Sequence, residues 1–391
     1  GMRRTGKTSF LMQQIAEARA SGTPADRLVY FSFEDERLAG LQADDLSFVL
    51  EEYYRQRPEY RGREEVTFFF DEIQLVDGWE CFARRILDSE KVDLFLSGSS
   101  ARLLSREVAT SMRGRAVEAI VYPFGFDEAL SHAGSEIPED SAFLSARQRS
   151  HLEKAFREYL VAGGFPEAQR LEPRDRRLLL QGYVDVVILR DIAERHQLTN
   201  LPAIRWMVRQ LLANAGGPFS ANRFHRDLES QKIRSSVNGL LEIYGHLEDA
   251  FLIHGVRIEA GSERKRQVNP VKTYPVDPGL IPVFDRTGRE NLGHALENAV
   301  LVELLRRGAE VTWVKTSKGF EVDFLARFPG GETELIQVAA LLTDPATVER
   351  ELRALLDARS DFKDARLRLL TLNQERGLPV AEDAGIEVTP A

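Results

Sequence analysis

The most constraining feature of the sequence is its first eight residues, which fit the phosphate-binding pattern G-x-x-x-x-G-K-[S/T] at every fixed position. Glycines in such a loop let backbone N–H groups turn toward a phosphate, and the following helix points its positive end to the same place. Apolar residues at helical spacing predict that helix over Ser9–Ala20. Lys7 would neutralise the β- and γ-phosphates, and the Thr8 hydroxyl would hold Mg²⁺. We therefore expect nucleotide contacts from Gly1, Arg4, Thr5, Gly6, Lys7 and Thr8.

A second segment, Val66-Thr67-Phe68-Phe69-Phe70-Asp71-Glu72, completes this expectation. Five apolar or β-branched residues before two acids predict a buried parallel strand with carboxylates at its C-terminal edge, where open α/β sheets bind ligands. Asp71 would act on Mg²⁺ through its water shell, and Glu72 would orient and polarise the attacking water. Such an acid pair is common by itself, but about 65 residues after a phosphate loop it predicts an ATP site in an α/β P-loop domain.

A third predicted strand, Val92–Leu96, ends in Ser97-Gly98-Ser99-Ser100. Ser97 or Ser99 could contact the γ-phosphate or the lytic water, or cap a following helix, because serine is a preferred N-cap. Arg113-Gly114-Arg115 follows. Arg115 could act as an arginine finger on a neighbouring subunit, or form a surface salt bridge.

The start of the chain departs from the pattern. A phosphate loop should follow a buried strand, and no strand precedes this one. Gly1-Met2 also reads like a cloning remnant in front of a start methionine, so that Gly1 would occupy the glycine position by accident. The missing strand would be central in the sheet, and its absence would leave backbone groups unpaired. We therefore expect a complete motif but a loose nucleotide site.

Composition excludes several classes of protein. The 391 residues carry a formal net charge of −9, which is not the charge of a polycation that coats DNA or anionic membranes. The single cysteine, Cys81, excludes a disulfide framework and a cysteine zinc site within one chain. No apolar run approaches the ~20 residues of a membrane span. We expect a cytoplasmic protein that does not bind membranes.

Together these motifs resemble one branch of the AAA+ ATPases. The phosphate loop, the Asp71-Glu72 pair and the Ser97–Ser100 segment are followed in order by Gly114-Arg115, Tyr122-Pro123-Phe124-Gly125-Phe126-Asp127-Glu128 and Gly163-Gly164-Phe165-Pro166-Glu167. This series is similar to the prokaryotic predicted ATPases that carry a C-terminal DUF4143 domain. The resemblance implies four modules: an AAA+ domain at residues 1–130, a helical lid at 131–200, a winged helix at 201–275 and a restriction-endonuclease-like α/β domain at 276–391.

The predicted winged helix carries two basic islands. Helices are expected at Ile204–Ala213, at Ala221–Leu228 after the cap Ser220, and at Ile233–Tyr244, the candidate recognition helix. Basic residues exceed acidic ones by two between Phe219 and Leu240, and by three between Arg257 and Lys272. These islands favour contact with DNA phosphates, although a winged helix used only for packing or protein contacts fits equally well.

The last predicted module resembles the PD-(D/E)XK nuclease core. We expect Leu296-Glu297-Asn298 to open a helix, Asp323 to lie on a strand and Gln337 to lie on the next strand, Glu334–Ala340. In such a core, carboxylates hold Mg²⁺ and a lysine helps to position the attacking water. Here Ala339 stands where the lysine belongs, so Lys315 or Lys318 would have to reach in from the preceding hairpin. We expect a catalytically inactive nuclease fold that binds nucleic acid or protein.

The sequence therefore predicts an ATP-binding, Mg²⁺-dependent ATPase whose turnover moves the C-terminal modules. One alternative is a nucleotide-gated regulator that binds double-stranded DNA. Another is a Mg²⁺-dependent nuclease built on Glu297, Asp323 and Gln337. A protein-interaction hub with a vestigial ATP site is a third. An unknown protein partner and a homo-oligomer are compatible with each of them.

Overall fold

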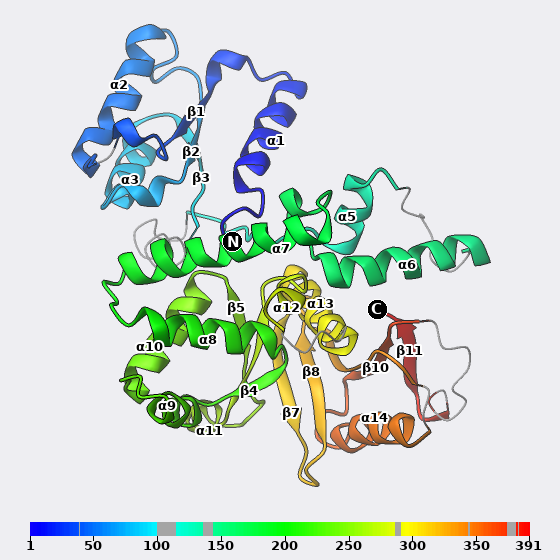
Figure 1. Ribbon diagram of the computed structural model, residues 1–391. Coiled ribbons are helices and arrows are strands. Elements are labelled where there is room, and N and C mark those ends of the chain that lie inside the picture. Colours follow the sequence, from blue (N-terminus) through cyan, green and yellow to red (C-terminus); the bar gives the residue numbers. More distant parts are fainter. Residues whose placement is uncertain are drawn as a thin grey trace. The chain divides into compact units, whose positions relative to one another are not determined.

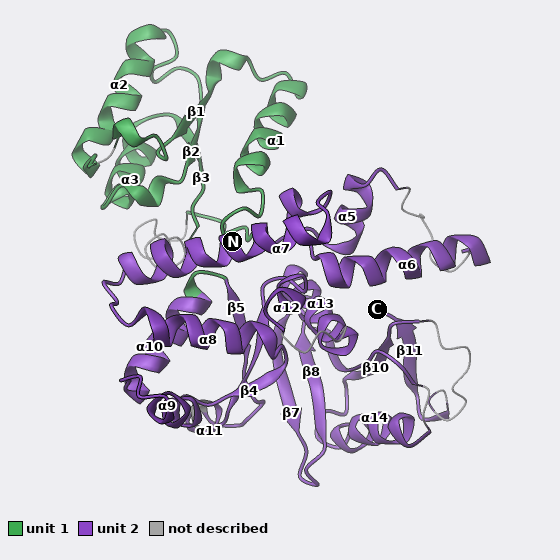
Figure 2. Cartoon of the chain, in the orientation of Figure 1, with its two compact units in different colours: residues 1–121, 249–251 green, residues 122–248, 252–391 purple. Residues whose placement is uncertain are grey.

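The structure, a computed structural model, describes residues 1–38, 40–99, 115–135, 144–285, 291–342, 345–373, 381 and 383–391. The chain forms two compact units (Figure 2). Unit 1 comprises residues 1–121 and 249–251, and unit 2 comprises residues 122–248 and 252–391. Among the described residues, no helix combines the length and the apolar character needed to cross a bilayer.

Unit 1 is a parallel three-stranded sheet between helices (Figure 1). Its described helices and strands are α1 (Lys7–Ala20), β1 (Leu28–Ser32), α2 (Ser47–Gln56), β2 (Val66–Asp71), α3 (Trp79–Ser89) and β3 (Val92–Leu96). The strand order is β1-β2-β3, so β2 is central and pairs with both neighbours in parallel. The predicted helix after the phosphate loop and the two predicted strands are confirmed.

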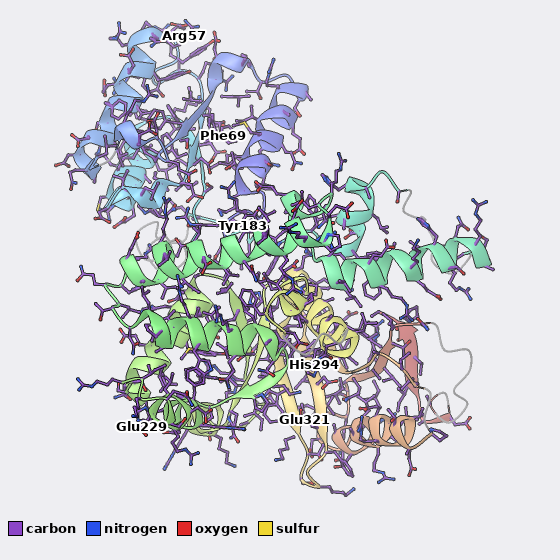
Figure 3. All side chains as sticks on the ribbon, in the orientation of Figure 1. Arg57, Phe69, Tyr183, Glu229, His294 and Glu321 are labelled. Atoms are coloured by element: carbon purple, nitrogen blue, oxygen red, sulfur yellow. The ribbon has the colours of Figure 1, made fainter. Side chains whose placement is uncertain are left out.

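The alternation of side chains along β2 explains why α1 lies on one face of the sheet and α2 and α3 on the other. Phe68 and Phe70 are fully buried in a core that includes residues of α2 and α3. Phe69, labelled in Figure 3, points to the opposite face, where α1 packs. It stacks on Phe95 of β3 with ring centroids 4.9 Å apart. Because the strands are parallel, their C-terminal ends meet at one edge, where Asp71 ends β2.

Unit 2 contains most of the helices and two sheets (Figure 1). Its described helices are α5 (Phe126–His132), α6 (Ala146–Ala162), α7 (Pro173–Val186) with a π-helical continuation at Val187–Glu194, α8 (Leu201–Ala213), α9 (Ala221–Ser230), α10 (Val237–Asp249), α11 (Glu263–Val268), α12 (Leu280–Phe284), α13 (Leu292–Arg306) and α14 (Pro345–Ala358). Its strands are β4 (Gly217–Phe219), β5 (Ile253–Val256), β6 (Val271–Pro275), β7 (Glu310–Lys315), β8 (Glu321–Arg327), β9 (Thr333–Ala339), β10 (Arg366–Thr371) and β11 (Ile386–Pro390).

The larger sheet of unit 2 is mixed, with strand order β11-β10-β9-β8-β7. β7, β8 and β9 pair antiparallel, whereas β9, β10 and β11 pair in parallel. Residues of α14 share one core with this sheet, and residues of α13 share the core on its other face. The smaller sheet is antiparallel, with order β4-β6-β5.

Two predicted helix starts are wrong by four residues, and a third helix, α8, begins at Leu201 rather than at Ile204. The candidate recognition helix begins at Val237 rather than Ile233, because Lys232 adopts a left-handed backbone (φ 59°) and the Ser236 hydroxyl accepts a hydrogen bond from Gly239 N at 3.1 Å. Similarly, α13 begins at Leu292, so Glu297 lies in its second turn rather than at its opening. Local hydrogen bonds from serine and asparagine set both starts.

The Gly163-Gly164 pair is held by a buried acid from elsewhere in unit 2. Asp277 accepts hydrogen bonds from Gly164 N at 2.5 Å and from Gly279 N at 2.8 Å. A Cβ atom at Gly163, whose φ is +76°, would lie only 1.8 Å from an oxygen of Asp277. Burial raises the pKa of Asp277 to about 7. Glycine is therefore required by close approach as well as by backbone conformation.

Candidate functional site

The phosphate-loop residues form a turn that leads directly into α1. Gly6 is the N-cap residue with φ 100°, and Arg4 also has a positive φ of 66°. The hydroxyl of Thr5 and the ammonium of Lys7 both donate to the carbonyl oxygen of Met2, at 3.0 Å each. These two side chains close the loop on itself. The loop thereby places Lys7 at the positive end of α1.

The carboxylate of Asp71 accepts hydrogen bonds from hydroxyl groups on three other segments of unit 1. Thr8, in the first turn of α1, donates to Oδ2 at 2.7 Å, and Tyr30 of β1 donates to the same oxygen at 2.9 Å. Ser97, just after β3, donates to Oδ1. Asp71 is 3% exposed, so these neutral donors satisfy a carboxylate that is almost entirely withdrawn from water.

The carboxylate of Glu72 lies beside the lysine of the loop. Its Oε1 is 3.8 Å from Lys7 Nζ, and its Oε2 accepts from Gln74 Nε2 at 2.5 Å. Glu72 has φ 54°, and its backbone N–H donates to Ser97 Oγ at 3.1 Å. Gln74 also donates to Ser99 Oγ at 3.4 Å. The structure thus brings Lys7, Glu72, Ser97 and Ser99 into one connected set of contacts.

Two members of this site were missed from the sequence. Tyr30 lies opposite Phe69 in the β1–β2 register, two residues before the pair Ser32 and Asp71. Burial raises the pKa of Tyr30 to about 12, and the hydrogen bond to Asp71 acts in the same direction. Tyr30 gives no sequence signal because the register that brings it to Asp71 is a tertiary property. Gln74, two residues after the acid pair, could have been found by its spacing alone.

Gly1, Arg4 and Arg115, the other residues that we predicted from the sequence to contact a nucleotide, lie in three different surroundings. A Cβ atom at Gly1 would lie 1.9 Å from the carbonyl oxygen of Val121, so a larger residue does not fit there. The side chain of Arg4 is exposed. Arg115 forms an exposed ion pair with Asp88 at 2.5 Å, near the C-terminal end of α3 and hence at the sheet edge opposite Asp71. Arg113, Gly114 and Ser100 lie outside the described residues.

In unit 2 the three nuclease-like residues lie close to one another, on α13, β8 and β9. Asp323 accepts from Val338 N at 3.0 Å, and its own N–H donates to Gln337 Oε1 at 3.3 Å. The β7–β8 register shifts between Thr312 and Val314, so the strand is irregular next to Asp323. Glu297 of α13 acts on the same carboxylate electrostatically.

A lysine from the smaller sheet lies among these acids. Lys272 Nζ of β6 is 2.6 Å from Glu321, 3.4 Å from Asp323 and 3.9 Å from Glu297. Its side chain is 7% exposed, and its ammonium lies 5.6 Å from the ring centroid of Trp313. We call Lys272, Glu297, Glu321 and Asp323 the acid–lysine cluster; Glu321 is labelled in Figure 3.

The electrostatics of the acid–lysine cluster are dominated by burial and by ion pairing. Burial disfavours the charged lysine, but Asp323, Glu297 and Glu321 outweigh it and raise the pKa of Lys272. Burial, assisted by Glu297 and opposed by Lys272, raises the pKa of Asp323 to about 7. The hydroxyl of Tyr274 donates to Glu297 at 2.6 Å. The lysine is therefore held in its charged form.

Lys315 and Lys318, which we considered from the sequence as replacements for the nuclease lysine, do not reach the acid–lysine cluster. Lys318 forms an ion pair with Asp357 at 2.6 Å, and Lys315 is exposed at the end of β7. In the sequence, Lys272 counts among the basic residues of the predicted wing. Because Lys272 lies 51 residues before Asp323, no local spacing connects the two.

Two of the other four basic residues of the predicted wing also lie near acids. Arg266 lies 3.7 Å from Glu259, and Arg257 lies 4.0 Å from Glu248. Arg264 and Lys265 on α11 are exposed, so with Lys272 buried only part of the island from Arg257 to Lys272 is available as a basic surface. By contrast, four basic residues on α9 and the turn before α10 are exposed, and none has an ion pair among the described residues: Arg223, Arg226, Lys232 and Arg234.

Neither site presents a ready-made cluster of metal-binding side chains. Among the described residues, no group of three or more histidine, cysteine, aspartate or glutamate side chains is placed to hold a metal ion. In the loop site the Mg²⁺ ligands would be Thr8 and Asp71, a hydroxyl and one carboxylate, as in phosphate-loop proteins that bind the metal together with the nucleotide.

Comparisons with known protein families match two parts of the chain. Residues 1–130 match the family described as AAA domain, and residues 153–290 match a domain of unknown function, DUF8612. The expected DUF4143 domain is not shown by these matches. A solved structure, the Walker-type ATPase PABY2304 of Pyrococcus abyssi, aligns with 73% of this chain and 89% of its own, at 15% identity and a TM-score of 0.42.

Two relatives match over most of the chain. The uncharacterized protein MJ1544 of Methanocaldococcus jannaschii is 33% identical over 383 residues, which cover 96% of this chain and 81% of the relative. An uncharacterized protein of Haemophilus influenzae is 30% identical over 340 residues, covering 87% of this chain and 81% of the relative. The chain therefore belongs to the family of these uncharacterized proteins, and its residues 1–130 match the AAA domain family.

Proposed function

We propose that this protein binds ATP with Mg²⁺ and hydrolyses it at the site formed by the phosphate loop and the acids at the end of β2. The observation that carries this proposal is the 2.7 Å hydrogen bond between Thr8 and Asp71. It joins the two side chains that P-loop proteins use around Mg²⁺, and they come from segments 63 residues apart. The residues fit the ligand because oxygen donors are what Mg²⁺ prefers.

Each side chain has a distinct role in this proposal. Lys7 and the N–H groups at the start of α1 would bind the β- and γ-phosphates, while Thr8 and Asp71 would hold Mg²⁺. Glu72 would orient and polarise the attacking water, and Ser97 and Ser99 would contact the γ-phosphate or that water. Bound Mg²⁺ supplies charge neutralisation to the phosphates. The Thr8 and Tyr30 hydroxyls can leave Asp71 at the cost of ordinary hydrogen bonds.

The test compares binding with turnover in three variants. Lys7→Ala should raise the Kd for Mg²⁺·ATP by about 10²-fold, because a charged group's hydrogen bonds to phosphate are lost. Glu72→Gln should bind ATP normally and lose hydrolysis. Lys91→Ala is the matched control, since Lys91 donates to the carbonyl of Arg63 on the surface of the same unit. Unchanged ATP binding in the Lys7 variant would refute the loop assignment.

We also propose the four-module division at residues 1–130, 131–200, 201–275 and 276–391, with hydrolysis moving the C-terminal modules. Arg115 would act on the nucleotide of a neighbouring copy, which requires a homo-oligomer and release of its ion pair with Asp88. Arg115→Ala should then lower the ATPase rate per chain only where light scattering shows an oligomer. Asp88→Ala, which frees Arg115, should not lower it.

A second candidate function is binding of double-stranded DNA through α9 and α10. It is supported by the four exposed basic residues named above and by the helix–turn–helix arrangement, in which Ser220 caps α9. Four phosphate contacts predict that log K falls with log[salt] with a slope of about −3.6. Arg226→Ala should reduce the slope by about one unit, whereas Arg257→Ala should leave it unchanged, because Arg257 lies 4.0 Å from Glu248. Binding without this salt dependence would contradict the proposal.

A further inference from the structure

The ammonium of Lys272 lies among the carboxylates that a nuclease centre would use to bind a metal ion. Two of the three carboxylates around it, Asp323 at 3.4 Å and Glu297 at 3.9 Å, belong to the ligand set that the sequence pattern predicts for Mg²⁺. The third, Glu321 at 2.6 Å, lies two residues before Asp323 on β8. Lys272, which belongs to β6 of the smaller sheet, thus neutralises the charge of these carboxylates.

The remaining predicted metal ligand is already engaged elsewhere. The side-chain oxygen of Gln337 accepts from the backbone N–H of Asp323 at 3.3 Å, and its amide nitrogen donates to Glu351 of α14 at 2.7 Å. Arg350 pairs with that same Glu351 at 2.5 Å. Gln337 therefore acts as a bridge between β8 and α14, and its oxygen is not directed at a cation.

The second oxygen of Asp323 is engaged as well, since it accepts from Val338 N at 3.0 Å. Asp323 thus has one oxygen on the lysine and the other on the backbone of β9. A buried ammonium costs much free energy unless charged partners surround it, and breaking such a group leaves uncompensated charges. The three carboxylates supply those partners.

We infer that Lys272 is the resident cation of this centre, taking the place of a divalent metal ion, and that the acid–lysine cluster fastens β6 of the smaller sheet to β8 and α13. This inference goes beyond the proposed ATPase and is independent of it. It also accounts for Ala339: a centre whose cation is a lysine from β6 needs no lysine on β9 to position a metal-bound water.

The first test measures Mn²⁺ binding by electron paramagnetic resonance, in which bound Mn²⁺ loses its free-ion signal. The full-length chain carries Asp71→Asn in every sample, which removes the carboxylate ligand of the loop site. We expect no Mn²⁺ site that depends on Asp323, so that adding Asp323→Asn changes nothing. Mn²⁺ binding that Asp323→Asn abolishes would overturn the inference, because the acids would then hold a metal beside the lysine. This test does not require any change at Lys272.

The second test removes the ammonium. In the same background, Lys272→Met keeps the length of the side chain and should create a site for one Mn²⁺ per chain, bound at least tenfold tighter than by the parent. Mn²⁺ should also raise the melting temperature of this variant and not that of the parent. Adding Asp323→Asn should remove both effects.

Lys318→Met is the matched control, since Lys318 also pairs with a carboxylate of unit 2, Asp357, at 2.6 Å but is exposed. It should acquire no Mn²⁺ site. A Lys272→Met chain that is folded by circular dichroism and binds no Mn²⁺ would overturn the inference. Cleavage of duplex DNA by the parent with Mn²⁺, abolished by Asp323→Asn, would do so too and would make the centre an active nuclease. If Lys272→Met does not fold, the first test decides.

Discussion

Each unit of this protein places a lysine beside buried carboxylates, but the two arrangements differ in what satisfies the acids. In unit 1, the Asp71 carboxylate accepts from the hydroxyls of Thr8, Tyr30 and Ser97, which are neutral. In unit 2, Asp323 faces the ammonium of Lys272. Neutral hydroxyl groups can give way to an incoming metal ion at small cost, whereas a buried ion pair cannot be opened without leaving bare charges. The first arrangement suits a site that binds a ligand. The second suits a structural contact that holds β6 against β8 and α13.

The difference between the two lysines gives the largest expected effect. Lys272→Met should lower the free energy of unfolding by about 3–5 kcal/mol in metal-free buffer, because the buried Asp323 and the partly buried Glu297 lose their cation. Lys7→Met should cost about 1 kcal/mol, since the Lys7 ammonium donates to the neutral carbonyl oxygen of Met2 at 3.0 Å and lies as far as 3.8 Å from the Glu72 carboxylate. Urea unfolding followed by circular dichroism measures both. Equal losses of unfolding free energy in the two variants would contradict the distinction between a structural contact and a ligand site.

Titration of a buried acid of unit 2 gives the next effect. The folded-state pKa of Asp277 is raised from 3.8 to about 7, so the folded state favours its neutral form. The associated stability is present below about pH 4 and is lost as pH rises through about 7, amounting to about 2–4 kcal/mol. The difference in unfolding free energy between the protein and Asp277→Asn, measured from pH 4 to 8, should show this decline. A difference that rises with pH would contradict it.

A smaller effect is expected from the turn that Asp277 holds. Gly163→Ala should destabilise the protein by about 2 kcal/mol, because the new Cβ meets an Asp277 oxygen and φ is +76°. Gly182→Ala, within α7 where a Cβ meets nothing within 4 Å, should instead stabilise it by about 0.5–1 kcal/mol. Thermal melts of both variants distinguish them. Similar effects at the two glycines would show that the turn adjusts freely.

The smallest effects come from the two tyrosines that donate to acids, one in each unit. Tyr30→Phe removes one donor from Asp71 and should lower the Mg²⁺ concentration needed for half-maximal ATP binding by about two- to fivefold. Tyr274→Phe removes the 2.6 Å hydrogen bond to Glu297 and should cost about 1 kcal/mol of stability, with no effect on ATP binding. If Tyr30→Phe weakened Mg²⁺-dependent binding instead, the hydroxyl would be a positioning group for Asp71 rather than a competitor for it.

The sequence alone determined the local parts of unit 1. A loop of fixed spacing and a run of phenylalanines ending in two acids specify a strand, a turn and a helix through backbone conformation and burial, and both depend on neighbours in sequence. Lys7, Thr8, Asp71 and Glu72 can therefore be identified as site residues from their spacing and their neighbours. The strands that carry Asp323 and Gln337 are likewise predicted from the sequence, and the structure has them as β8 and β9, each with a continuous run of buried residues.

Only the tertiary structure decided which partners these residues have. Tyr30 reaches Asp71 through the register of parallel strands, Asp277 reaches Gly164 across 113 residues, and Lys272 reaches Asp323 from a different sheet. None of these contacts produces a periodicity or a fixed spacing in the sequence, because each depends on how helices and strands pack against one another after they have formed. For that reason the sequence pattern places Lys272 on a basic surface. Its charge can be read from the sequence, but its burial among three carboxylates is set by the packing of β6 against β8 and α13.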